Sequence, residues 1–150
     1  MPKQINRALN STKTADATTR RFSVNGARVS QNDPHTILFD EPQVITDGTV
    51  QKDGSYYDIP SLDIASWNGF SKRLGTAIGA QKDLANNRVT IAGIKFSRNN
   101  PEAQLAMDMA VEGLIEFSTG TLGWTEDDGR RENHQIYELS IVGVGNNDNT

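Results

Sequence analysis

Short apolar runs, each closed by a turn-forming pair, constrain the fold of this 150-residue chain more than any other feature. Glycine after Asn or Asp suits tight hairpin turns, and proline interrupts the hydrogen bonding of a strand. The pairs in the first half are Asn25-Gly26, Asp33-Pro34, Glu41-Pro42, Asp47-Gly48 and Asp53-Gly54. We therefore expect short strands in this half, over 21–24, 35–39, 44–50 and 55–59.

The second half predicts longer strands and a charged connection. Residues 88–96 are rich in β-branched side chains, and 114–118 and 135–144 are largely apolar, so each predicts a strand. The run EDDGRREN at 126–133 is expected to be an exposed loop. In the last strand the residues expected to be buried are Ile136, Tyr137, Leu139, Ile141 and Val142.

Two helices are expected. Asn100 followed by Pro101 is typical of a capped helix start and Gly113 of a helix end, which predicts a helix over 101–112. Its expected apolar face consists of Leu105, Ala106, Met109 and Ala110. A shorter helix is expected near 61–67, with Ser61 as its N-cap. The predicted fold class is α+β, with a small, mostly antiparallel sheet.

Composition excludes several classes of site. The chain has no cysteine and only two histidines, His35 and His134, which argues against disulfides, thiolate or histidine-rich metal sites and cysteine nucleophiles. Adjacent carboxylates in the Glu126-Asp127-Asp128 run fit a solvated turn better than an ion site. No apolar stretch is long enough for a membrane span, and the first residues lack a secretory signal. We expect a soluble protein without cofactor or metal.

Charge divides the chain into two parts. Residues 1–30 carry six basic groups against Asp16 alone, giving +5, while the remaining 120 residues carry 9 basic and 18 acidic groups, giving −9. We expect a basic arm over 1–20 and a single domain over 21–150. Such an arm suits a solvated terminus, an acidic protein partner or a nucleic acid. An acidic domain repels a duplex, so nucleic acid is the least favoured partner.

Several short motifs occur in a characteristic order. They are Trp67-Asn68-Gly69, Leu74-Gly75-Thr76, the Asn100-Pro101 helix start, Ser118-Thr119-Gly120, and Glu138-Leu139-Ser140-Ile141-Val142. In this order they resemble the prohead maturation proteases of tailed bacteriophages, which are serine peptidases related to the herpesvirus assemblins. The resemblance covers about 60–150 and implies a barrel-like sheet.

The resemblance also implies site residues. Ser118 falls on the family's nucleophile, and Glu138 is the acid that would orient a base. The family's histidine base position is occupied by Asn68, or by Gly69 if Trp67 is the anchor, and neither residue can accept a proton at neutral pH. Loss of a triad base costs on the order of 10⁶ in kcat. These features favour a pseudoenzyme.

The expected function is therefore that of a structural protein of a phage head. The resemblance implies a minor capsid, decoration or assembly protein that binds the major capsid protein in many copies or as a homo-oligomer. It would occur in the virion, and in the host cytoplasm during assembly. The alternative is an active serine endopeptidase that cleaves capsid or scaffold protein, with Ser118 as nucleophile and His35 or His134 as its base.

Overall fold

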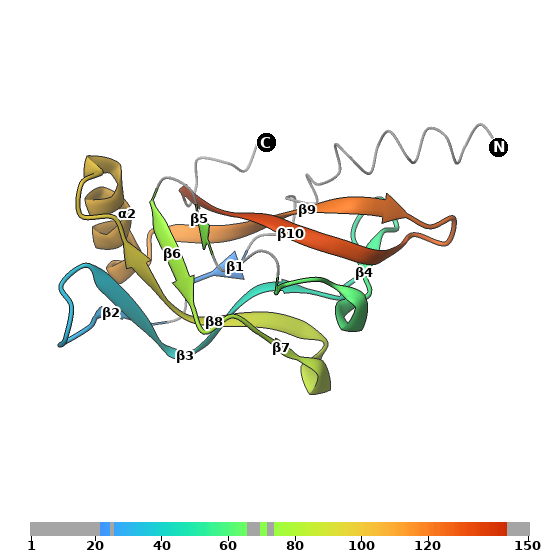
Figure 1. Cartoon of the computed structure of the whole chain (residues 1–150), viewed down its shortest axis with the longest axis horizontal. Coiled ribbons are helices and arrows are strands. Elements are labelled where there is room, and N and C mark those ends of the chain that lie inside the picture. Colours follow the sequence, from blue (N-terminus) through green and yellow to red (C-terminus); the bar gives the residue numbers. More distant parts are fainter. Residues whose placement is uncertain (1–21, 25, 66–69, 72–73, 144–150) are drawn as a thin grey trace.

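A computed structural model describes residues 22–24, 26–65, 70–71 and 74–143 (Figure 1). Within them lie two β-sheets, one α-helix, α2 (Pro101–Val111), and two 3₁₀ helices, η2 (Ile59–Ser61) and η3 (Leu84–Asn86). The first sheet has the order β1 (Phe22–Ser23), β9 (Ile115–Thr125), β10 (Arg130–Gly143), β4 (Tyr56–Tyr57). The second has the order β2 (Ala27–Val29), β3 (Thr36–Asp47), β8 (Arg88–Phe96), β6 (Gly75–Ile78), β5 (Phe70–Ser71), and β7 (Gln81–Asp83) also pairs with β8.

The mostly antiparallel arrangement confirms the predicted sheet type, but the expected barrel is wrong. Every pairing between the named strands is antiparallel except that of β10 with β4. Among the described strands, neither sheet closes on itself or on the other. The outer strands β1 and β4 each pair with their neighbour over only two residues. Because these edge strands are so short, they do not extend the hydrogen-bonded ladder of the first sheet into the second sheet.

The two sheets are joined by a shared apolar layer. Phe39 of β3 meets Phe117 of β9 edge to face, with ring centroids 5.9 Å apart. Around this contact, both sheets and α2 contribute fully buried aliphatic side chains, among them Ile37, Ile45, Ile91, Ala103, Ile115 and Ile136. Burial of this layer supplies the main driving force that holds one sheet against the other.

Helix α2 begins and ends as expected, and its buried face overlaps the predicted one at Ala106 and Ala110. The Asn100 side chain accepts a hydrogen bond from the Glu102 amide, and Gly113 after the helix has a φ of 75°. The buried residues are Ala103, Ala106, Met107 and Ala110, whereas Leu105 is exposed. Both stripes satisfy helical spacing, so the pattern alone did not separate them. Packing decides between them.

The short helix expected near 61–67 is wrong over the residues that the structure describes. The chain forms η2 at Ile59–Ser61 and then runs extended beside β10. There the Asp63 amide donates to the His134 carbonyl at 2.7 Å, and the Ile136 amide donates to the Asp63 carbonyl at 3.2 Å. These bonds replace those that a helix would have made within the segment. Residues 66 and 67 lie outside the described residues.

The long strands extend further than the sequence predicted. Strand β3 joins the predicted strand 35–39 to the first half of the predicted strand 44–50 and ends at Asp47, with breaks in its register against β8 between Leu38 and Gln43 and between Val44 and Thr46. Strand β9 continues to Thr125 and β10 begins at Arg130, so the exposed connection is only 126–129. The expected loop over 126–133 is therefore too long. Its second half is strand because Arg131 and Glu132 pair with Thr125 and Trp124 of β9.

We expect Phe117→Ala to lower the free energy of unfolding by about 3–5 kcal/mol, since Phe117 is completely buried at the contact between the sheets. Leu122→Ala, in the same strand but half exposed, serves as the control and should cost less than about 1 kcal/mol. Urea denaturation of both variants measures the difference. Equal losses would show that the Phe39–Phe117 contact does not hold the sheets together.

Candidate functional site

Ser118 and Glu138 lie on neighbouring strands, but in different environments. Ser118 lies in β9 opposite Ser140 of β10, and only 4% of its surface is exposed. Glu138 lies opposite Gly120 and is exposed. A nucleophile has to reach the carbonyl carbon of a substrate, and a buried strand hydroxyl is poorly placed for that. The proposed base position, Asn68, lies outside the described residues together with Trp67 and Gly69.

The two histidines make other contacts. His134 is fully buried, with Nδ1 3.1 Å from the Thr121 hydroxyl and Nε2 2.9 Å from the Trp124 carbonyl oxygen. His35 precedes β3, where its amide donates to Asp33 and its carbonyl accepts from the Phe96 amide. Both ring nitrogens of His134 are therefore engaged by partners other than Ser118.

His134 belongs to a buried chain of hydrogen bonds, which we call the polar chain. It runs from Arg131 through Tyr57, Thr121 and His134 to the Trp124 carbonyl. Arg131 Nη1 donates to Tyr57 Oη at 3.0 Å, and Tyr57 Oη lies 2.9 Å from Thr121 Oγ1. All four side chains are buried. The polar chain links β4 to β9 and β10 near the turn that joins β9 to β10.

Simple donor and acceptor rules fix the direction of the polar chain. A carbonyl oxygen only accepts, so His134 Nε2 must carry the proton that is shared with Trp124. Burial lowers the pKa of His134 from 6.5 to about 4, so at neutral pH the ring is uncharged and Nδ1 accepts from Thr121. Thr121 then accepts from Tyr57, whose oxygen accepts from Arg131. Every hydroxyl donates once and accepts once.

Arg131 carries the only charge of the polar chain. Its guanidinium lies over the Tyr57 ring, 5.0 Å from the centroid, and Nη2 is 3.9 Å from the Asp53 carboxylate. Within the described residues, Nε and Nη2 have no hydrogen-bond partner. Burial alone would raise the pKa of Asp53, but hydrogen bonds from Ser55 and the charge of Arg131 hold it below 3.8. A half-exposed carboxylate therefore balances a buried cation.

The sequence alone did not predict most members of the polar chain. It singled out His134 as a candidate base but assigned no role to Tyr57, Thr121 or Arg131. Arg131 stands in a run of charged residues, which ordinarily indicates an exposed loop. Simple alternation would place Arg131 and His134, which are three residues apart, on opposite faces, and a register shift between Glu132 and Gln135 allows both to be buried. No local pattern shows that Tyr57, 74 residues away, meets Arg131.

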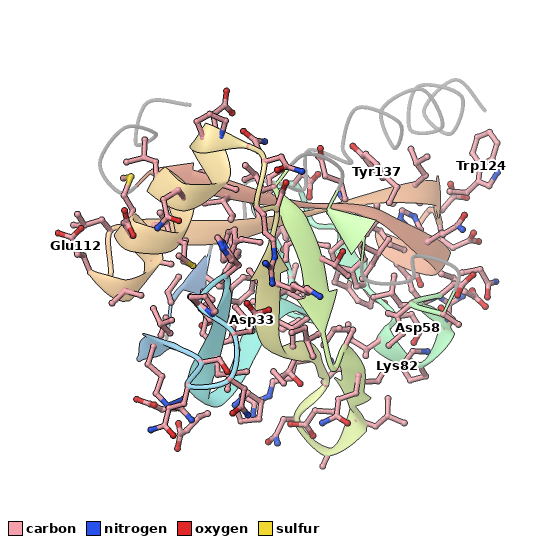
Figure 2. The ribbon with its side chains drawn as sticks, turned by 60° about the vertical axis from the view of Figure 1, so that its left-hand side comes forward. Asp33, Asp58, Lys82, Glu112, Trp124 and Tyr137 are labelled. Atoms are coloured by element: carbon pink, nitrogen blue, oxygen red, sulfur yellow. The ribbon has the colours of Figure 1, made fainter. Side chains whose placement is uncertain are left out.

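The other side of the β9–β10 hairpin is exposed and apolar, and we call it the ribbon face. Leu122, Trp124 and Tyr137 are 46%, 65% and 42% exposed. Figure 2 shows Trp124 at the end of the molecule opposite Glu112, with Tyr137 on the same hairpin nearer the middle. Tyr137 was expected to be buried, which is wrong. A register shift between Ile136 and Glu138 turns it outward, where its ring covers Gly120.

Comparisons with protein-family models, with curated proteins and with solved structures find no match for this chain. No helix in the described part of the chain has the length and apolar character needed to cross a membrane. In the same residues, no cluster of three or more His, Asp or Glu side chains is arranged to hold a metal ion.

We expect Tyr57→Phe to lower the free energy of unfolding by about 2–3 kcal/mol, because it leaves Arg131 Nη1 and Thr121 without their shared partner. Tyr56→Phe, one residue earlier and half buried, should change it by less than about 0.5 kcal/mol. Chemical denaturation at neutral pH measures both. If Tyr57→Phe left the free energy of unfolding unchanged, the hydrogen bonds of the polar chain would not stabilise the fold.

We also expect the free energy of unfolding to decrease at acidic pH because His134 becomes protonated. Its folded pKa of about 4 lies below the unfolded value of 6.5, so the unfolded state binds the proton first. The free energy of unfolding therefore decreases as pH falls from about 6.5 to about 4, by about 3 kcal/mol from this residue. His134→Gln, which does not titrate, should show a shallower loss over the same range. Denaturation series at several pH values test this, and parallel curves for the two proteins would refute it.

Proposed function

We propose that this chain is a non-catalytic structural protein of a bacteriophage head, built on a prohead-protease-like fold. It would act as a minor capsid, decoration or assembly protein and bind the major capsid protein in many copies. The ordered motifs of residues 60–150 support the family. The described residues have the mostly antiparallel sheets and the helix expected of it, but the two sheets do not close into the barrel that the resemblance implies.

The burial of Ser118 is the observation that carries the non-catalytic part of the proposal. A serine peptidase needs an accessible hydroxyl and a base within about 3 Å of it. Here the hydroxyl is on a residue with 4% exposure, and both His134 nitrogens are hydrogen-bonded to Thr121 and Trp124. Neutral His134 is held as part of a structural network. The same hairpin exposes three large apolar side chains, which is typical of a binding surface.

Two measurements test the proposal. The chain should sediment with shells assembled from the major capsid protein of the same phage, at a fixed ratio that saturates. Incubated with that capsid protein or its scaffold, it should give no cleavage product, and Ser118→Ala should behave identically. A product that depends on Ser118 would establish the endopeptidase instead. Failure to bind either assembling or finished shells would refute the structural role.

A further inference from the structure

The ribbon face combines exposed apolar side chains with carboxylates. In an antiparallel pair, residues directly opposite each other point to the same side of the sheet. Glu138 lies opposite Gly120, over which Tyr137 packs, and Glu132 lies opposite Trp124 with its carboxylate 2.9 Å from Arg130 Nη2. Three more acidic residues, Glu126, Asp127 and Asp128, follow at the exposed tip of the hairpin. The surface thus offers aromatic rings bordered by negative charge.

The charge of the hairpin is opposite to that of the N-terminal arm. From Ile115 to Gly143 there are six acidic and two basic residues, giving −4, and one of the two basic residues is the buried Arg131. Residues 1–21 contain five basic residues and one acidic residue, giving +4, and three of the five are arginines. A guanidinium both pairs with carboxylates and stacks on Trp or Tyr rings. The arm therefore has the chemistry that this surface would bind.

The attachment of the arm brings it to the same strand. Phe22 pairs with Phe117 and Ser23 with Glu116, antiparallel, so the chain that precedes Phe22 is joined at β9 on the side that leads toward Leu122 and Trp124. Seven residues separate Phe117 from Trp124, which is about 23 Å along a strand. Twenty-one residues reach up to about 70 Å when extended. The arm is long enough to cover the whole ribbon face within one molecule.

We propose that the basic N-terminal segment 1–21, which is the expected arm with Arg21 added, binds the ribbon face of its own molecule, with arginine side chains on Trp124 and Tyr137 and an ion pair to Glu138. This contact does not depend on the proposed role in a phage head.

Trp124 serves as the reporter. In a Trp67→Phe background it is the only tryptophan of the chain, and acrylamide quenching of its fluorescence measures its accessibility. Quenching scales with the fraction of molecules in which Trp124 is uncovered, so an arm bound in two thirds of them lowers the quenching constant about threefold. Deleting residues 1–21 should therefore raise the constant about threefold. Adding a peptide of residues 1–21 to the truncated protein should lower it again.

Charge and concentration provide the controls. Raising the salt to about 1 M, where the screening length falls to about 3 Å, should weaken the protection. Glu138→Gln should raise quenching of the full chain, whereas Glu112→Gln, at the far end of the molecule in Figure 2, should leave it unchanged. Equal quenching with and without the arm would overturn the proposal. Protection that disappears on dilution would overturn it too, because it would assign the arm to a second copy.

Discussion

The fold depends on one shared apolar layer, in which Phe39 of one sheet packs against Phe117 of the other. No ladder of hydrogen bonds joins the two sheets in the described part of the chain, so their relation rests on side-chain packing. The helix α2 adds small side chains to the same layer, Ala103, Ala106 and Ala110. Because the outer strands are short, most of the remaining structure is held through β3, β8, β9 and β10.

The polar chain is a second constraint, with a different physical character. A buried Arg131 is costly unless it is paired, and here Tyr57, Asp53 and the face of the Tyr57 ring share that task. Since each hydroxyl has one donor and one acceptor partner, removing any member leaves another unsatisfied. This requirement fixes the position of the short strand β4 against β10, which only two residue pairs would otherwise hold.

The β9–β10 hairpin has two faces because neighbouring residues in a strand point in opposite directions. Thr121 points inward to His134, while Leu122 beside it is exposed. Ser118 falls on the same side of β9 as Gly120 and Leu122, but it is only 4% exposed, whereas Trp124 and Tyr137 are exposed. The candidate serine and the aromatic surface therefore differ in exposure, and the two proposals can be tested independently.

The sequence by itself determined the local structure. Turn pairs and β-branched runs placed β8 at its observed bounds, and the Asn100-Pro101 start and the Gly113 end placed α2 to within a residue, because these signals act between near neighbours. Only the tertiary structure decided which helix face is buried, that Asp63 pairs with Gln135 of β10 where a helix was expected, and that Arg131 is buried and Tyr137 exposed, the reverse of what was expected. Those outcomes depend on partners far along the chain and on register shifts, and neither can be predicted from the pattern of neighbouring residues in the sequence.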